Sequence, residues 1–163
     1  MLNDNNVNVL IVDDLPDNLL ALEAVIRLED RTIFQASSGE EALALLLAHE
    51  FALAILDVQM PGMNGFELAE LMRGTEKTRH IPIVFVTAAG KDSNFAFKGY
   101  ESGAVDFLYK PLDVQAVQSK VNVFALLHRQ RLETRRQVLA LEKSRQEQEA
   151  LLENLQTTQM ALQ

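Results

Sequence analysis

The chain has 163 residues, a formal net charge of −8 at neutral pH and no cysteine. This length suits one domain with an extension, and the lack of cysteine excludes disulfides, thiol catalysis and thiolate metal sites. No apolar run approaches the roughly 20 residues that span a bilayer, the polar N-terminus is unlike a signal peptide, and no basic patch is typical of a nucleic-acid binder. We therefore expect a cytoplasmic protein that binds neither membrane nor nucleic acid directly.

Short apolar runs alternate with helical patterns over the first two thirds of the chain. The runs are rich in β-branched and aromatic residues and predict buried strands at 7–12, 31–35, 51–56, 82–87 and 105–109. Helices are predicted near 17–28, 39–49, 65–73 and 93–102, and a fifth is predicted to start near 113. This alternation predicts an α/β fold built from βα units around a parallel sheet.

Polar residues stand where four of these strands end. Asp13 and Asp14 follow the first strand, Asp57 the third and Thr87 the fourth, while Lys110 follows the fifth. Because the carboxyl ends of parallel strands meet at one edge, we expect these side chains to form one site. Three crowded acids favour a hard cation such as Mg²⁺, and a hydroxyl and an ammonium beside it suit phosphoryl oxygens.

The composition changes after Pro111, because no glycine or proline follows it. Residues 1–112 carry a net charge of −9 and residues 113–163 a net charge of +1. We expect a compact domain over 1–127 and an extended fifth helix over 113–163.

That helix carries an imperfect heptad pattern. Apolar pairs at the two core positions alternate with polar pairs, in the order Phe124/Leu127, Arg131/Thr134, Val138/Leu141, Arg145/Gln148 and Leu152/Leu155. The pattern favours a parallel coiled coil that makes the protein a homodimer, and a solvated single helix is the alternative. Polar layers would keep such a coil marginally stable, which suits a transmitter of conformational change.

Four sequence motifs together resemble the receiver (response-regulator) domain of two-component signalling. They are VLIVDD at 9–14, ILDVQMPGMNGFEL at 55–68, VFVTA at 84–88 and GAVDFLYKP at 103–111, and the resemblance covers about residues 7–127. It implies a doubly wound, flavodoxin-like sheet of five parallel strands in the order 2-1-3-4-5, followed by a long C-terminal helix.

The resemblance also implies a role for each acid of the site. Asp57 would be the phosphoacceptor, in a reaction that depends on Mg²⁺ as cofactor. Asp14 would bind the metal directly and Asp13 mainly through water, and Asp57 with the backbone carbonyl of Gln59 would complete the protein ligands.

Three further residues complete the expected switch. By resemblance, Lys110 would pair with one phosphoryl oxygen, and Thr87 would move to hydrogen-bond another. Phe107 matches the switch aromatic, which turns inward when the threonine moves, and the Lys110-Pro111 bond is expected to be cis.

The expected function is a phosphoacceptor switch and not a separate enzyme. It would take phosphate from a histidine kinase or phosphotransfer protein and transmit its state through the dimeric helix of 113–163. No output domain is present in the sequence, and the expected parent is a longer protein with a histidine kinase or a diguanylate cyclase. The alternative is a pseudo-receiver, an interaction module that never takes phosphate.

Three enzyme classes are disfavoured by single residues. A haloacid-dehalogenase-type phosphatase needs an acid two residues after its nucleophile, where this chain has Gln59. A P-loop would need a glycine at Phe85 and a hydroxyl residue at Asp92. His128 lacks the following acid and nearby proline of a kinase phosphoacceptor.

Overall fold

A computed structural model of the chain describes residues 6–88 and 106–162. Its strands are β1 (Val7–Val12), β2 (Arg31–Ala36), β3 (Leu53–Asp57), β4 (Ile83–Thr87) and β5 (Asp106–Tyr109). Its helices are α1 (Pro16–Ile26), α2 (Gly39–Ala48), α3 (Gly65–Arg73) and α5 (Val114–Ala161). These bounds agree with the predicted elements to within about two residues. The helix predicted at 93–102 lies outside the described residues.

The five strands form one parallel sheet in the order β2-β1-β3-β4-β5, which confirms the predicted topology. The strand order reverses between β1 and β3, which is where open α/β sheets bind ligands. The register pairs Val12 with Leu56 and Asp57 with Val86, and pairs Thr87 with Tyr109. The ends of β1, β3, β4 and β5 are therefore level with one another at one edge.

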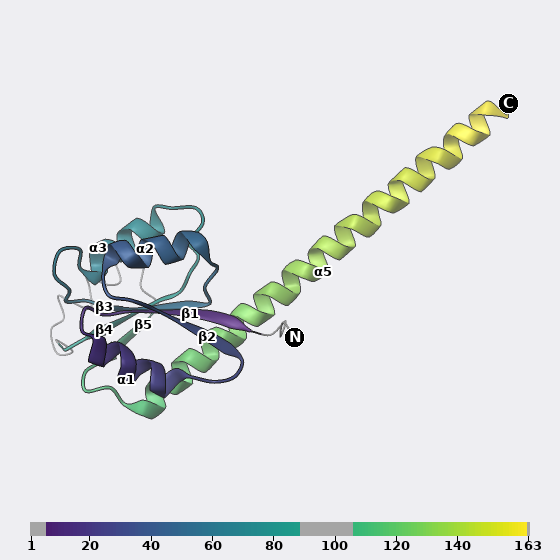
Figure 1. Ribbon diagram of the computed structural model, residues 1–163. Coiled ribbons are helices and arrows are strands. Elements are labelled where there is room, and N and C mark those ends of the chain that lie inside the picture. The colour runs from purple at the N-terminus through teal and green to yellow at the C-terminus, as the bar shows by residue number, and fades with distance from the viewer. Residues whose placement is uncertain (1–5, 89–105, 163) are drawn as a thin grey trace. The chain divides into compact units, whose positions relative to one another are not determined.

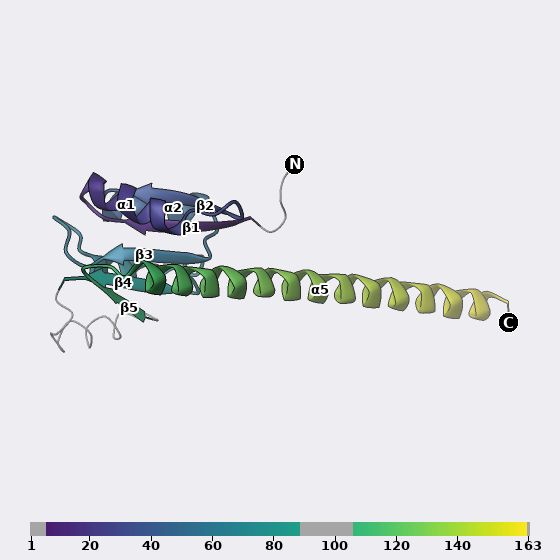
Figure 2. The same cartoon turned by 90° about the horizontal axis from the view of Figure 1, so that it is seen from below.

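Alternation along the strands sends apolar side chains into two separate layers. Helices α2 and α3 cover one side of the sheet (Figure 1). There Leu46 of α2 and Met72 of α3 are fully buried in one cluster. On the other side, Leu19 of α1 packs in a second cluster that also contains Val117 and Val121 of α5. Figure 2, seen from this second side, shows α1 and the start of α5 as two separate helices.

A buried arginine ties the start of α5 to the end of α1. The Arg31 side chain is 2% exposed, and its guanidinium donates to the Ile26 carbonyl at 3.3 Å and to Asn122 Oδ1 at 2.9 Å. Gln118 of α5 also donates to the Val25 carbonyl, at 3.0 Å. Since Ile26 and Val25 form the last turn of α1, these bonds use carbonyls that the helix itself leaves unsatisfied.

Helix α5 begins at a short connection from β5. The Asp113 carboxylate accepts from the Ala116 amide at 3.0 Å, as a helix N-cap residue does. Only Pro111 and Leu112 separate Asp113 from Lys110, and the Lys110-Pro111 bond is cis.

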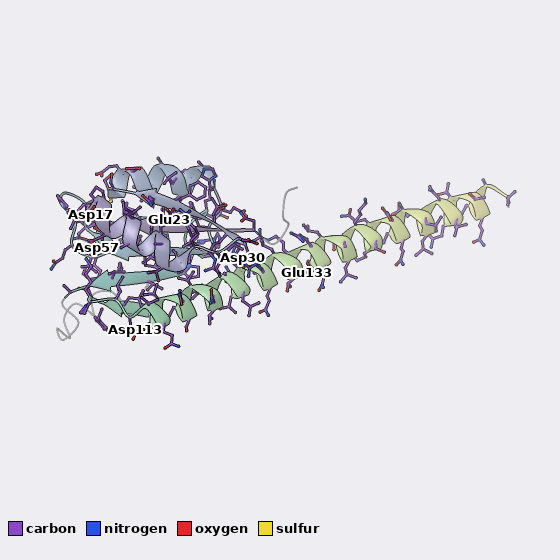
Figure 3. The ribbon with its side chains drawn as sticks, turned by 60° about the horizontal axis from the view of Figure 1, so that its bottom comes forward. Asp17, Glu23, Asp30, Asp57, Asp113 and Glu133 are labelled. Atoms are coloured by element: carbon purple, nitrogen blue, oxygen red, sulfur yellow. The ribbon has the colours of Figure 1, made fainter. Side chains whose placement is uncertain are left out.

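The 48-residue helix α5 belongs to two compact units, one covering residues 1–128 and the other residues 129–163. In the second unit, every described residue from 133 onward is exposed. Figure 3 shows side chains projecting all round this part of the helix. Among the described residues, no helix combines the length and the apolar composition that crossing a membrane requires.

Candidate functional site: an acidic pocket at the sheet edge

The predicted site residues meet at the carboxyl edge of the sheet. Asp57 is the last residue of β3 and Thr87 the last of β4, and both are buried. Asp13 directly follows β1, and its amide donates to the Ala36 carbonyl at 3.1 Å. The Lys110 amide donates to the Thr87 carbonyl at 3.0 Å, which fixes the residue after β5 beside the end of β4.

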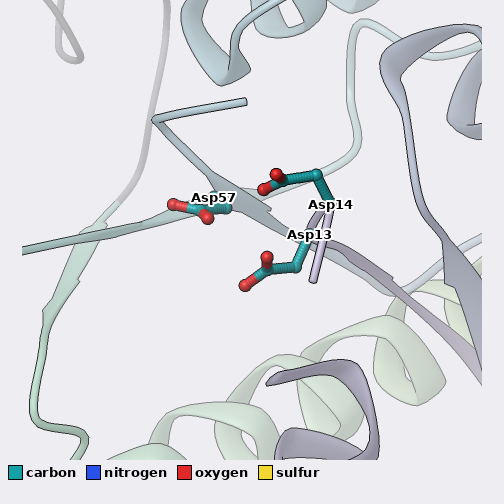
Figure 4. Close-up of side chains that lie close together, drawn as sticks. All are labelled: Asp13, Asp14 and Asp57. Atoms are coloured by element: carbon teal, nitrogen blue, oxygen red, sulfur yellow. The ribbon is translucent and has the colours of Figure 1, made fainter. Parts of the chain in front are cut away.

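Three carboxylates lie close together at this edge (Figure 4). Carboxylate oxygens of Asp13, Asp14 and Asp57 all lie within 4.8 Å of one another. Within residues 6–88 and 106–162 this is the one group of three or more acids or histidines close enough to share a metal ion. Other acids labelled in Figure 3, such as Asp17 and Glu23 on α1, lie outside it.

The environment of Asp57 disfavours its ionised form. Burial in the sheet edge, followed by repulsion from the Asp13 carboxylate, raises the pKa of Asp57 from 3.8 to about 6. The Lys110 ammonium and the Gln59 amide oppose this rise, because each stabilises the carboxylate. A cation held between the acids would remove the repulsion.

Lys110 reaches two of the three acids. Its Nζ lies 3.6 Å from Asp57 Oδ2 and 4.0 Å from Asp13 Oδ2, and the side chain is 33% exposed. The pocket contains one ammonium and three carboxylates. It therefore keeps negative charge that a further cation can neutralise.

Asp13 and Asp14 differ in what already occupies their oxygens. Asp13 accepts from the Leu15 amide at 3.0 Å and from the Asn18 side-chain amide at 3.1 Å. No hydrogen bond or ion pair of the Asp14 carboxylate occurs among the described residues. The Asp14 oxygens are therefore the more available ones for direct coordination of a metal.

The sequence analysis did not predict Asn18 as a residue of the site. An amide residue five positions after an acid, in the first turn of a predicted helix, could have indicated it.

The loop after β3 is built to hold Asp57 in place. The Gln59 amide donates to Asp57 Oδ1 at 3.3 Å, and Gly62 has a φ of +71°, a conformation that side chains disfavour. Asn64 and Glu67 then form a capping box at the start of α3.

Gly65 brings the start of α3 directly against the backbone of Asp57. A Cβ at Gly65 would overlap the Asp57 carbonyl oxygen and lie 3.0 Å from Val58 Cα. The sequence analysis missed this constraint, because a glycine after asparagine indicates a turn equally well.

Thr87 and Phe107 lie on the same side of the sheet, since Phe85 precedes Thr87 by two residues and pairs with Phe107. The Phe107 side chain is buried, with its ring centre 5.6 Å from that of Phe85 and 6.2 Å from that of Tyr109. The expected switch aromatic thus occupies an inward position here. His128, by contrast, lies on α5 and is not among the acids and histidines grouped at this edge.

The fold and site define a doubly wound α/β protein with an acidic pocket at its topological switch point. Residues 9–122 match the family model described as "Response regulator receiver domain". The chain therefore belongs to the response regulator receiver family.

Named relatives and solved structures support this membership. The chain is 39% identical over 108 residues to the response regulator PleD of Caulobacter vibrioides, and the match covers 66% of this chain and 24% of PleD. It is 36% identical to the transcriptional regulatory protein SrrA of Staphylococcus aureus, over 74% of this chain and 48% of SrrA. The structure of the Vibrio cholerae chemotaxis protein CheY4 matches with a TM-score of 0.68 and 26% identity, covering 72% of this chain and 98% of CheY4.

The chain spans about a quarter of PleD and about half of SrrA.

Proposed function

We propose that the chain is a cytoplasmic phosphoacceptor switch in which Asp57 takes a phosphoryl group from a histidine kinase or a phosphotransfer protein. The observation that carries the proposal is the convergence of Asp13, Asp14, Asp57, Thr87 and Lys110 at one sheet edge. In the reaction an Asp57 carboxylate oxygen forms a bond to phosphorus while the bond between phosphorus and the donor breaks. The donor's histidine nitrogen leaves with the electron pair of that bond.

The surroundings of Asp57 suit this nucleophile. Burial and the Asp13 charge raise the pKa of Asp57 to about 6, so the carboxylate is mostly ionised at neutral pH and is poorly stabilised. A carboxylate that is destabilised in its free form gains from transferring charge to an incoming phosphoryl group. Lys110, 3.6 Å from Asp57 Oδ2, is placed to neutralise a phosphoryl oxygen.

The donor set fits Mg²⁺, which prefers oxygen ligands and keeps several waters. Asp13, Asp14, Asp57 and the Gln59 carbonyl would hold the ion, with Asp14 as the direct aspartate ligand and Asp13 acting through water. Bound there, Mg²⁺ would supply neutralisation of the charge that develops on the phosphoryl oxygens.

A matched pair of variants tests the metal assignment. Asp14→Asn is expected to weaken Mg²⁺ binding by about tenfold or more, and Asp13→Asn by less, because Asp13 is already hydrogen-bonded to Leu15 and Asn18. Mg²⁺ titration followed by NMR measures both affinities. Equal loss in the two variants would contradict the direct and water-mediated roles.

Thr87 and Phe107 are proposed to report the phosphorylated state. The Thr87 hydroxyl would hydrogen-bond a phosphoryl oxygen, and Phe107 would keep or lose its inward position according to where that hydroxyl lies. Thr87→Ala is then expected to accept phosphate but to transmit poorly.

Phosphate uptake is tested by incubating the chain with acetyl phosphate and Mg²⁺ and measuring the intact mass. We expect a gain of one phosphoryl group that EDTA abolishes and that Asp57→Asn lacks. Asp17→Asn is the matched control, because Asp17 is an acid outside the pocket. Absence of uptake under all conditions would favour the pseudo-receiver, and uptake by Asp57→Asn would refute the assigned acceptor.

The output is proposed to run through a homodimeric helix over 113–163 toward an output segment such as a histidine kinase or a diguanylate cyclase. The exposed leucines support this: Leu141 is 71% exposed, Leu152 58% and Leu155 55%. A single solvated helix gains nothing from such residues, whereas a parallel pair would bury them. Phosphorylation would change the register or stability of the pair.

Two leucine variants distinguish a dimeric coiled coil from a single solvated helix. One leucine lies at a core position of the proposed heptad pattern, and the other lies outside the core positions. Leu141→Arg is expected to give monomers in light scattering at tens of micromolar protein, because Leu141 is a core position. Leu139→Arg is the control, since Leu139 is 63% exposed but lies outside the core positions. A monomeric unmodified protein, or equal dissociation by both variants, would contradict the dimer.

A further inference from the structure

A cavity of about 340 Å³ opens between α1 and the start of α5, on the side of the sheet that these helices cover. Three lining residues come from three neighbouring strands, namely Val12, Ile55 and Val86, and the last two belong to the apolar layer on this side of the sheet. Ala21 and Val25 line the side formed by α1. The size is within the range of small-molecule sites, which are mostly apolar with a few convergent polar groups.

The opposite wall of the cavity comes from the chain that follows Lys110. Leu112, Val114 and Val117 contribute apolar surface to it. Val117 is fully buried in the layer between the sheet and α5, whereas Val114 is 52% exposed. The cavity therefore runs from the apolar core to the surface.

The polar groups of this cavity gather at one end. Asn18, Asp13 and Asp57 line it together with Lys110. Asn18 and Val25 are seven residues apart on α1, so the lined stretch of helix is about 10 Å long at about 1.5 Å per residue. Two carboxylates against one ammonium leave this end negative, and the nearby Asp14 adds to that charge.

We propose that this cavity binds a small amphiphilic cation, an organic ammonium or amidinium attached to an apolar body. The head would lie among Asp13 and Asp57 in place of the metal, and the body would lie between α1 and α5 over the sheet. An apolar chamber favours the body, and the charge at its end selects a positive head over a neutral or negative one.

Such a ligand would inhibit phosphate uptake by competing with Mg²⁺, a consequence that rests on the proposed function. Binding itself does not depend on phosphorylation, because the charges and the cavity exist in the unmodified chain.

The test is a calorimetric titration of the full chain in EDTA with phenylbutylamine, and with phenylbutanol and phenylbutyrate as neutral and anionic ligands of the same body. We expect phenylbutylamine to bind about tenfold more tightly than phenylbutyrate, with phenylbutanol between them. Added Mg²⁺ should raise the apparent Kd of the amine. Absence of amine binding, or equal binding of amine and carboxylate, would overturn the proposal.

A matched pair of tryptophan variants locates the site. Ala21 is exposed and lines the cavity, whereas Ala24 is exposed on the same helix and does not line it. Ala21→Trp should fill the cavity and weaken amine binding by about tenfold or more, and Ala24→Trp should leave it within about twofold. Equal affinity in both variants would overturn the location.

Phosphate uptake from acetyl phosphate then separates this proposal from the proposed function. The amine should slow uptake by the unmodified chain and not by Ala21→Trp, with each rate compared with that of the same protein without amine. If the chain never takes phosphate, the proposed function fails while the titration still decides the cavity. If phosphate is taken up but no amine binds, only the cavity proposal fails.

Discussion

The two units of the chain differ in how much of their apolar surface is buried. In residues 6–88 and 106–128, each strand contributes to an apolar layer and the helices cover both faces of the sheet. In the helix from 133 onward, no described residue is buried, although eight large apolar residues between Val138 and Leu162 are exposed. The first unit is stabilised by its own packing. A lone solvated helix is marginal in water, so the second would gain stability from a partner.

The largest expected difference between the units concerns leucine. Leu46 is fully buried in the α2–α3 layer and Leu139 is 63% exposed. Leu46→Ala should lower the free energy of unfolding by about 3 kcal/mol, because it leaves a cavity among packed side chains. Leu139→Ala should change it by less than about 0.5 kcal/mol. Urea denaturation followed by circular dichroism measures both free energies of unfolding. Similar losses in the two variants would contradict the difference in packing between the units.

A second difference concerns how the stability of the first unit, which contains Asp57, depends on pH. Burial, followed by the Asp13 charge, raises the pKa of Asp57 from its usual 3.8 to about 6, so the folded chain holds this proton more tightly. The contribution of Asp57 to stability therefore falls as pH rises from about 4 to about 6 and stays low above that range. In EDTA, Asp57→Asn should stabilise the chain by about 2 kcal/mol near neutral pH and by little near about pH 4. Urea midpoints at several pH values test this, and a constant effect across the range would contradict it.

The smallest expected difference concerns arginines. Arg31 has a buried side chain bonded to the Ile26 carbonyl and Asn122, whereas Arg145 pairs with Glu149 at 2.6 Å on the exposed helix. Arg31→Met should cost about 1.5 kcal/mol, because it leaves the buried Ile26 carbonyl without this donor. Arg145→Met should cost less than Arg31→Met, since water replaces exposed partners. Thermal unfolding measures the loss of stability in both variants. A larger loss for the Arg145 variant would indicate that this part of the helix is not simply a solvent-exposed single helix.

Short apolar runs ended by polar residues were sufficient to predict the parallel sheet, and the strand order was implied by the resemblance of four motifs to receiver domains. The same signal placed Asp13, Asp57, Thr87 and Lys110 at one edge, and the structure brings them there. Their chemical roles stay predictions, since they were implied by resemblance and not by geometry.

Other features depend on distances that no local pattern encodes. Nothing around Arg31 indicates that it reaches Asn122, which is 91 residues away in the chain. The contact of Gly65 with the Asp57 backbone and the cavity between α1 and α5 likewise arise only when separate elements pack. Tertiary packing, and not the hydrophobic period, decides such features.

The short connection between Lys110 and α5 allows little movement of one relative to the other. Lys110 contacts two pocket acids through its ammonium and the end of β4 through its amide, and three residues later Asp113 caps α5. Three residues span at most about 10 Å even when fully extended. Any shift of the Lys110 backbone must therefore be absorbed within those residues or pulled into the first turn of α5. The connection from the pocket to the helix is therefore covalent and short.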